Sequence, residues 1–578
     1  MIYDIIKTID TIEKMEPITK GCSEDKKYCV ETASGEKLML RIADISEYDR
    51  KKAEYEMMER MDNIGVLTSR PVEFGLCDDG KSVYSLSGWL DGGDVHSILP
   101  TLGEIEQYQL GIKSGELLRK IHTLPAAKNA EPWGVRLRRM IKGNIEYYNT
   151  HDFKSPHTEL IINYLNDNAE ILDSRPQTAI HGDFWVANLI RLPNGEIAVI
   201  DFNNDIENYG DPWFELGMTF PLGGVEPFYA HFFTAMFRGH FGGDPPHEFY
   251  KILKYYYAFH ALAAVRDIGE ANGDDRNERI SWFENIALRF NEFDEMGDFA
   301  PTWYLRNFHV EYVAGVPIKL KKPFDFSFLN KYGTVFKVVK HGEGSLNLCF
   351  GVENGDKKYF VKFAGAPNEM DASTDETIGF LKDAAQIYQD LAHESLIKLI
   401  KGEEVGGGYA NIFEWVDAEC IGYPSPPSRQ KLLSLPIEAK LRAFDDILKF
   451  HAHVANQGYV AIDFYADQIL YNFESGRTTI CDIDFYQKSP YYGDKGTWGS
   501  ANFVSPEEMI PGSRVDEITM VYTMGATAFS IFSDYDRSLE KWTIDERLYE
   551  VANRAVSDDR DMRQQSIREF MLEWKHGD

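Results

Sequence analysis

The sequence has little cysteine, no long apolar run and a deficit of basic residues. Six of its 578 residues are cysteine, and none forms a C-x-x-C pair, so neither a zinc knuckle nor a thioredoxin-type redox site is predicted. No apolar run approaches the roughly 20 residues that span a membrane. Basic residues number 61 and acidic residues 92, a net charge of −31, which repels nucleic acid and anionic lipid. We therefore expect neither a nucleic-acid nor a membrane partner.

The remaining composition is typical of a globular protein. Hydrophobic residues make up 43% and charged residues 26% of the chain, which excludes wholesale disorder and a disulfide scaffold. Residues 1–12 mix Asp and Lys with apolar residues and lack the basic tip and apolar core of a signal peptide. With six cysteines that we expect to be reduced thiols, these features predict a cytoplasmic protein.

One order of features occurs twice along the chain. Each copy has a glycine-containing turn, a strand with a basic residue, a helix, a long helical stretch, an Asp-centred loop and a second Asp behind an apolar strand. We predict one domain over 1–305 and another over 324–578, a division that the length favours at about 100–200 residues per domain. The Gly, Pro and Lys residues of 306–323 indicate a linker, with an extra strand packed on either domain as the alternative.

In the first copy, a basic residue on a strand precedes an acidic residue on a helix. The alternation over residues 37–44 predicts a strand with Arg41 on the face away from the aliphatic residues. Residues 46–62 have helical spacing and include Glu54. A cation on a strand that faces a glutamate on a helix is suited to holding phosphate oxygens. Taken alone, such a pair is more often an ordinary surface salt bridge.

A polar loop further along favours phosphate chemistry. His181-Gly182-Asp183 is followed by Asn188 and, after an apolar strand, by Asp201. Phosphoryl transfer needs a carboxylate that accepts the proton of the attacking hydroxyl, and oxygen ligands for Mg²⁺. Asp183 suits the first role, and Asn188 and Asp201 suit the second. His181 has no partner histidines at metal-binding spacing, so we expect it to brace the Asp183 loop by a hydrogen bond.

These motifs resemble the aminoglycoside phosphotransferase and choline kinase family over the whole first copy. The matching segments are the phosphate loop 21–23 with Ser23, and 54–58, 86–90, 181–188, 200–202 and 210–213. The resemblance implies a kinase that transfers phosphate from ATP, with Mg²⁺, to a hydroxyl of a small molecule such as an aminoglycoside or amino alcohol. Arg41 stands where the family usually has lysine; its forked guanidinium can still bind phosphates.

The second copy resembles divergent bacterial serine/threonine protein kinases. Gly342 and Gly344 precede an apolar strand and an Asn-Gly hairpin signal, and the next strand carries Lys362. The resemblance implies that these three residues bind ATP and that Asp463 is the catalytic base. It also implies that Gln468 and Asp482 hold the metal. Further on, Glu507 matches the A-P-E motif, and Arg563 is expected to meet it in a buried ion pair.

This copy departs from the protein-kinase pattern at several points. The usual His-Arg before Asp463 is missing, glutamine replaces the asparagine ligand at 468, and Met520 replaces a structural aspartate. Ala384 falls where the helix glutamate belongs, so Glu376 or Asp383 would have to pair with Lys362. Asp484 adds a carboxylate that could hold a metal.

The fold class expected from both resemblances is α+β: two tandem protein-kinase-like domains, each with a small antiparallel β lobe and a larger helical lobe. The adenine is expected near Trp89 and near Trp415. Three functions remain open. The first is a small-molecule kinase fused to a kinase that phosphorylates Ser or Thr of a protein. The second is one active kinase regulated by a nucleotide-binding pseudokinase, and the third is a non-catalytic nucleotide-sensing scaffold.

Overall fold

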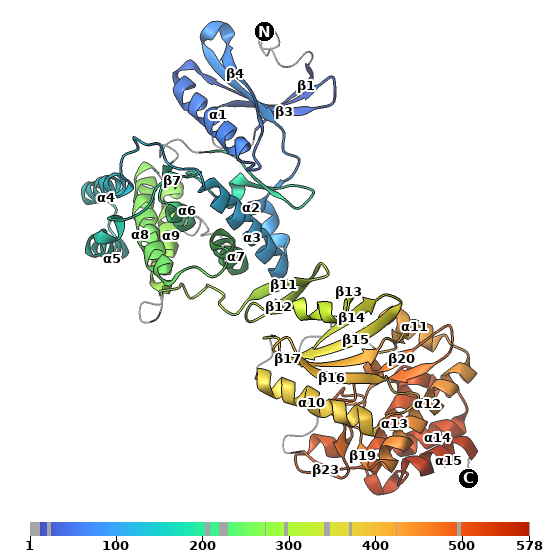
Figure 1. Cartoon of the computed structure of the whole chain (residues 1–578). Helices are drawn as coiled ribbons and strands as arrows, with labels where there is room; N and C mark the ends of the chain where they lie inside the picture. Colours follow the sequence, from blue (N-terminus) through green and yellow to red (C-terminus); the bar gives the residue numbers. More distant parts are fainter. Residues whose placement is uncertain are drawn as a thin grey trace. The chain divides into compact units, whose positions relative to one another are not determined.

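The computed structural model describes residues 12–19, 25–202, 209–218, 229–271, 273–293, 297, 299–339, 347–368, 373–422, 425–493 and 499–576. The chain divides into two compact units, Met1–Arg306 and Asn307–Asp578, called unit 1 and unit 2 below. Figure 1 draws unit 1 in blue to green and unit 2 in yellow-green to red. No helix among these residues has the length and apolar character needed to cross a membrane.

Unit 1 begins with a small antiparallel sheet in the strand order β1-β2-β3-β5-β4. The strand bounds are Ile12–Ile18 (β1), Lys26–Thr32 (β2), Lys37–Asp44 (β3), Pro71–Cys77 (β4) and Ser82–Gly88 (β5). The turn between β2 and β3 contains Gly35 at φ 79°, a left-handed conformation that glycine adopts without strain. Leu38, Leu40 and Ile42 of β3 lie in one apolar cluster, so Arg41 lies on the opposite face of the sheet.

Helix α1 (Tyr48–Asn63) packs against this sheet (Figure 1). Its Tyr55 ring lies 5.5 Å from the ring of Phe74 on β4. Further along the helix, Met57 and Met61 are buried in the main core of unit 1. The helix therefore links the sheet to the helical part of the unit.

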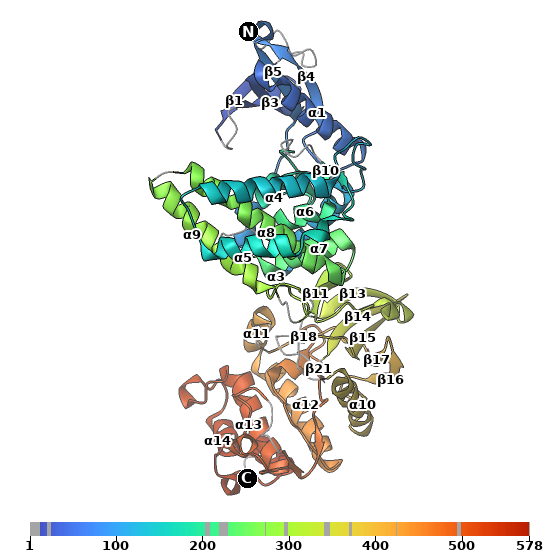
Figure 2. The same ribbon diagram turned by 90° about the vertical axis from the view of Figure 1, so that its left-hand side faces the viewer.

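Most of unit 1 is helical. The helix bounds are Val95–Ile98 (α2), Glu104–Ile121 (α3), Trp133–Thr150 (α4), Pro156–Asp167 (α5), Pro212–Met218 (α6), Ala230–Phe241 (α7), His247–Glu270 (α8) and Gly273–Arg289 (α9). Helix α8 is buried along most of its length and packs against α4, α5, α6 and α9 (Figure 2). A helix buried on nearly all sides forms the centre of a core.

Glycines allow α3 and α7 to approach closely. A Cβ atom on Gly111 would lie 2.2 Å from the main-chain oxygen of Phe232, and one on Gly115 would lie 2.0 Å from that of Met236. Neither distance is compatible with a side chain, so glycine is required at both positions. The close packing brings the end of α3 beside the end of α7.

The five-stranded sheet of unit 2 has the same strand order, β13-β14-β15-β17-β16. The bounds are Thr334–Val339 (β13), Leu348–Asn354 (β14), Lys357–Ala364 (β15), Leu399–Val405 (β16) and Gly408–Glu414 (β17). One helix, Thr374–Asp390 (α10), packs against β15, β16 and β17. The hairpin signal at Asn354-Gly355 is confirmed, because Asn354 pairs with Lys357 across the turn.

The rest of unit 2 is mainly helical. The helix bounds are Pro426–Leu433 (α11), Ile437–Asn456 (α12), Glu517–Ser533 (α13), Glu546–Ala555 (α14) and Ile567–His576 (α15). From Thr519 onwards, every residue of α13 is buried. It packs against α11, α12, α14 and α15, so it is the centre of this core.

Short strands also match between the units. Unit 1 has a three-stranded sheet, β6-β8-β9, and a pair, β7-β10; unit 2 has β18-β20-β21 and β19-β22. Their bounds are Gly93–Asp94 (β6), Thr178–Ala179 (β7), Leu189–Arg191 (β8), Ile197–Val199 (β9), Tyr209–Gly210 (β10), Glu419–Cys420 (β18), Tyr459–Val460 (β19), Ile469–Tyr471 (β20), Thr478–Ile480 (β21) and Gln487–Lys488 (β22). Unit 2 has a further pair, Tyr491–Tyr492 (β23) with Arg514–Val515 (β24). The predicted repetition of features therefore extends to the topology.

The segment expected to be a linker forms a hairpin instead. His309–Val313 (β11) pairs with Val316–Leu320 (β12). Val313, Ile318 and Leu320 are buried with residues of the unit 2 sheet. The correction has a simple cause: the alternating apolar residues of this segment cover one face, which the sheet buries.

Candidate active site

The loop that carries Asp183 in unit 1 is held by its own polar groups. Asn188 Nδ2 donates to the Asp183 carboxylate at 2.9 Å and to the Asp183 main-chain oxygen at 3.0 Å. His181 Nδ1 accepts from the Asp183 N–H at 3.2 Å, so its Nε2 carries the proton and donates to the Ile200 oxygen at 3.0 Å. The expected brace by His181 is confirmed. The same ring ties this loop to the strand that leads to Asp201.

Asp183 and Asp201 lie close enough in unit 1 for their charges to interact. The Ile200 N–H donates to the main-chain oxygen of Asn188 at 2.9 Å. This hydrogen bond joins the two loops a second time. Burial is the largest cause of a raised pKa at Asp183, and the charge of Asp201 raises it further, against the opposing effect of His181. A carboxylate with a raised pKa is a better proton acceptor than an ordinary one.

Glu215 on α6, which was not predicted from the sequence, anchors this loop from behind. Its Oε2 accepts from the His181 N–H at 2.8 Å, and its Oε1 accepts from the Gly182 N–H at 2.6 Å. Glu215 has no solvent exposure. Burial acts to raise its pKa, but hydrogen bonding and charge from His122 and His181 outweigh burial and lower it. The carboxylate therefore stays ionised.

Two buried histidines complete the anchor. His122 Nε2 lies 2.9 Å from Glu215 Oε2, and His122 Nδ1 lies 2.9 Å from His240 Nε2. His122 follows α3 and His240 lies on α7, so the close packing of these helices brings the pair together. Burial is the largest cause that lowers the pKa of His240 to about 3. The geometry suits donation from a neutral His240 to His122 and from His122 to Glu215.

Asp201 is directed towards the small sheet. It has φ 59°, an uncommon conformation for a residue other than glycine. Arg41 on β3 donates from Nη2 to Asp201 Oδ1. Burial acts to raise the pKa of Asp201, but the charge and hydrogen bond of Arg41, with the charge of Lys27, outweigh burial and lower it. The loop therefore presents an ionised carboxylate to the strand cation.

The predicted pairing of Arg41 with Glu54 is wrong. Glu54 accepts instead from Arg50 at 2.8 Å and from Lys51 at 3.2 Å, residues one turn away on the same helix and therefore within easy reach. Lys51 also donates to Asp25 at 2.6 Å, and both side chains are almost fully buried. Glu54 thus helps to hold a buried Lys51–Asp25 pair beside Arg41.

The oxygen atoms of Asn188 and Asp201 fit a divalent cation that also binds phosphates. Asn188 uses only its NH₂ group in the loop, and its Oδ1 has no hydrogen-bond partner in the described part of the chain. Asp201 contacts Arg41 through Oδ1 alone. No cluster of three or more His, Cys, Asp or Glu side chains among the described residues is suited to a metal. Mg²⁺ typically takes one or two protein oxygens and completes its shell with phosphates and water.

In unit 2 Lys362 is buried, and its partners differ from those expected. Lys362 Nζ lies 2.5 Å from Asp482 Oδ1 and 2.7 Å from Asp484 Oδ2. Neither Glu376 nor Asp383 takes the place of the missing helix glutamate. Asp484, on the loop that also carries Asp482, pairs with the lysine instead.

Glu376 and Asp383 are placed away from the lysine for clear reasons. Glu376 forms a capping box with Ser373 at the start of α10, and Asp383 is exposed. Ala384, the residue in the expected register, has no solvent exposure. The inner face of α10 is therefore apolar at this level.

Gln468 does not have the arrangement of a metal ligand. Its Nε2 donates to the Asp463 main-chain oxygen, and its Oε1 accepts from the Tyr465 N–H at 3.2 Å. The extra methylene relative to asparagine lets the amide fold back onto its own loop. Burial is the largest cause that raises the pKa of Asp463 to about 7, with the charge of Asp482 next.

The amide oxygen of unit 2 is therefore not available to a magnesium ion as that of Asn188 is in unit 1. Gln468 is engaged within its loop, and Asp482 and Asp484 already share a buried ammonium group. Asp482 has φ 58°, nearly the value of Asp201, so the two loops have the same local conformation. The difference lies in the side chains.

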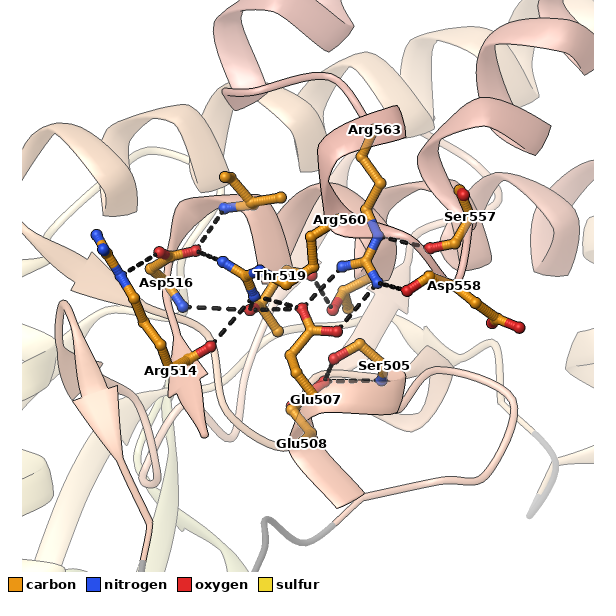
Figure 3. Close-up of polar contacts among 12 residues, drawn as sticks. Ser505, Glu507, Glu508, Arg514, Asp516, Thr519, Ser557, Asp558, Arg560 and Arg563 are labelled. Atoms are coloured by element: carbon orange, nitrogen blue, oxygen red, sulfur yellow. Dashed lines mark hydrogen bonds and ion pairs between the residues drawn. The ribbon is translucent and has the colours of Figure 1, made fainter. Parts of the chain in front are cut away.

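The predicted ion pair between Glu507 and Arg563 is confirmed, and it is part of a larger network (Figure 3). Arg563 donates from Nη1 to Glu507 Oε1 at 2.7 Å and from Nη2 to Oε2 at 3.0 Å. Thr519 and Arg560 also donate to Glu507. Burial acts to raise the pKa of Glu507, but Arg563 first, then its own main-chain N–H and Thr519, lower it to about 2. Arg560 also contacts Asp516, the residue that caps α13.

Several predicted residues can be placed only in part. Ser23, Gly342 and Gly344 lie outside the described residues. Trp89 and Trp415, expected near the adenine, directly follow β5 and β17. Their main-chain N–H groups donate to the oxygens of Lys37 at 3.2 Å and Lys358 at 3.3 Å. Trp89 and Trp415 therefore occupy matching positions in the two units.

Glu215 could have been found from sequence spacing. Asp211 and Glu215 are four residues apart after the Tyr-Gly of β10, and Asp516 and Met520 are four residues apart after β24. Met520 stands at the position where a structural aspartate is expected in the second copy. Applying the same offset to unit 1 points to Glu215.

Comparison with family models finds a match within unit 1. The model of the phosphotransferase enzyme family (APH) matches residues 14–250, which therefore form a domain of that family. A solved structure from Ralstonia eutropha JMP134, provisionally assigned as an aminoglycoside phosphotransferase, is 13% identical with a TM-score of 0.40; the match covers 49% of this chain and 95% of that one. No curated protein matches the chain.

Proposed function

We propose that unit 1 transfers the γ-phosphate of ATP to a hydroxyl group of a small molecule. The proposal rests on one observation above all: Asp183, Asn188 and Asp201 lie on two loops that hydrogen bonds join through His181 and Ile200. The match of residues 14–250 to the phosphotransferase enzyme family supports it. The proposed transfer requires a base, oxygen ligands for Mg²⁺ and a phosphate-binding cation in one place.

In the proposed reaction the Asp183 carboxylate accepts the proton of the acceptor hydroxyl. The hydroxyl oxygen forms a bond to the γ-phosphorus while the bond from that phosphorus to the bridging oxygen breaks, and ADP leaves. Asn188 keeps Asp183 in place through Nδ2. With Asp201, Asn188 would hold the Mg²⁺ that neutralises charge on the phosphates. Arg41 would bind the α- and β-phosphates.

The acceptor class proposed is a cationic aminoglycoside or amino alcohol. The net charge of −31 favours approach of a cationic acceptor over that of an anionic one. The acceptor itself is to be identified by a screen.

The test is transfer of labelled γ-phosphate by the full chain to a panel of amino sugars and amino alcohols. We expect transfer to at least one acceptor, and a loss of about 100- to 10,000-fold in Asp183→Asn, the range that a positioned base contributes. ATP binding should persist in that variant. Wild-type rates in Asp183→Asn would refute the assignment of the base. Asp79→Asn, the same change at an exposed position between β4 and β5, is the matched control.

For unit 2 we propose a nucleotide-binding regulatory role rather than a second transfer reaction. The observation that favours it is the use of Gln468 within its own loop and of Asp482 and Asp484 by Lys362. A serine/threonine protein kinase remains the competing function. Autophosphorylation or phosphorylation of a generic protein substrate that is lost in Asp463→Asn but kept in Asp183→Asn would establish the competitor.

A further inference from the structure

We propose that unit 1 grips the nucleotide phosphates with two strand cations, Lys27 on β2 and Arg41 on β3, and not with Arg41 alone. The inference rests on the proposed function of unit 1 and names a binding residue that neither the motifs nor the family match supplies. It follows from strand pairing, burial and charge.

The pairing register places the two cations side by side. Lys27 is directly opposite Arg41 in the antiparallel pair β2–β3. Residues opposite each other on antiparallel strands lie on the same face with Cβ atoms about 5 Å apart. Arg41 points to Asp201, so Lys27 lies on the face of the sheet that is turned to the catalytic loops.

Lys27 is buried, and its charge acts on Asp201. It is only 9% exposed, an unusual burial for lysine. Its charge contributes to lowering the pKa of Asp201. Asp25, which directly precedes β2, is buried against Lys51 of α1, so the start of the strand that carries Lys27 is fixed to the helix beside it.

Two like charges on neighbouring strands are unfavourable unless anions lie between or beside them. Asp25, Glu54 and Asp201 provide part of that compensation, since all three act on Arg41. A triphosphate carries further negative charge, and two cations on one face offer donors to separate phosphates. Arg41 stands in place of the usual lysine, and Lys27 supplies an ammonium group beside it.

Unit 2 lacks this second cation. The residue opposite Lys362 in the corresponding pair, β14–β15, is Cys349, which is 1% exposed. Unit 2 thus places one cation where unit 1 places two, and that cation is bound by Asp482 and Asp484. The geometry predicts tighter phosphate binding in unit 1.

The test compares variants of the full chain by calorimetric titration with ATP, ADP and adenosine in the presence of Mg²⁺. All variants carry Lys362→Ala, so that phosphate binding by unit 2 is reduced in every titration. Lys27→Ala should weaken ATP binding about 10- to 100-fold, the range for a hydrogen bond to a charged group. Adenosine binding should change less than about twofold, and Lys27→Arg should restore most of the ATP affinity.

Lys26→Ala is the matched control, because Lys26 is exposed on the same strand and its side chain alternates to the other face. Unchanged ATP binding in Lys27→Ala would overturn this inference but leave the proposed function of unit 1 in place. An equal loss of ATP and adenosine would also overturn it, since that result indicates a structural role. Absence of ATP binding in the Lys362→Ala chain itself would remove the proposed function of unit 1. Lys27→Met, which keeps the aliphatic stem, replaces Lys27→Ala if the latter does not fold.

Discussion

In unit 1 the loop that carries Asp183 is anchored by the buried carboxylate of Glu215, whereas in unit 2 the matching position on α13 is Met520. Unit 1 leaves the side-chain oxygen of Asn188 open, whereas unit 2 uses both amide atoms of Gln468 within the loop. The strand order is the same in both units. The comparison teaches that one topology can preserve the position of an aspartate while the side chain five residues later changes from one with an open amide oxygen, Asn188, to one with none, Gln468.

The two units also differ in where they bury ionic groups. In unit 1 the buried carboxylate of Glu215 binds the loop that carries Asp183. In unit 2 the buried carboxylate of Glu507 lies in the network with Arg560 and Arg563, which joins two helical segments. Glu215 therefore fixes the geometry of the candidate site, whereas Glu507 stabilises the helical core.

The largest expected effect is that of Glu215→Met, which copies unit 2 into unit 1. The change leaves the N–H groups of His181 and Gly182 and the ring of His122 without their partner, at a cost of about 3 kcal/mol or more in the free energy of unfolding. Displacement of the loop by about 1 Å would lower kcat about 100-fold. Denaturation and labelled phosphate transfer measure the two effects.

Met520→Leu is the matched control for this change, because it conserves volume at the corresponding position and should cost less than about 1.5 kcal/mol. If Glu215→Met kept full transfer activity, the anchoring role of Glu215 would be refuted, whatever its effect on stability.

The next largest effect concerns the core of unit 2. Arg563→Ala removes a bidentate partner from the buried Glu507, and we expect the unfolding free energy of unit 2 to fall by about 3 kcal/mol, towards the low end for a broken buried pair because Arg560 remains. Chemical denaturation checks this. Arg560→Ala should cost less, since that side chain is 25% exposed. An Arg563→Ala chain within about 1 kcal/mol of wild type would contradict the account.

The smallest expected effect is a change in pH dependence at Asp463. Its pKa of about 7 in the folded state lies above the ordinary value, so the folded state binds more protons between about pH 4 and 7 and stability falls as pH rises through that range. Asp463→Asn should remove this slope and, at pH 8, stabilise unit 2 by on the order of 1 kcal/mol, a figure discounted because the group is partly solvated. Unfolding measured from pH 4 to 8 tests the sign.

Asp356→Asn, at an exposed turn of the same unit, should leave the pH slope as it is. A wild-type slope in Asp463→Asn would show that other groups produce it.

Local patterns predicted much of this structure from the sequence. Residues 37–44 form β3 with the expected facing of Arg41, and His181 braces the loop as expected. The pairing of Glu507 with Arg563 was also predictable, because both residues belong to a recognisable pattern. Alternation and motif spacing involve residues that are close in the sequence. They can therefore be recognised without knowledge of the packing.

Other features depended on packing that the sequence does not display. Arg41 contacts Asp201 and not Glu54 because the helix supplies Glu54 with nearer cations. The fold-back of Gln468 depends on one methylene group, and the burial of residues 309–320 as a hairpin depends on a sheet formed later in the chain. Such features are set by tertiary geometry.

The most direct measurement is the number of metal–nucleotide sites per chain, obtained by titrating Mn²⁺ with saturating ATP and following the paramagnetic signal. The account predicts one site, which Asp201→Ala abolishes and Asp482→Ala leaves intact. Two equivalent sites, or one site that is lost with Asp482→Ala and kept with Asp201→Ala, would contradict it.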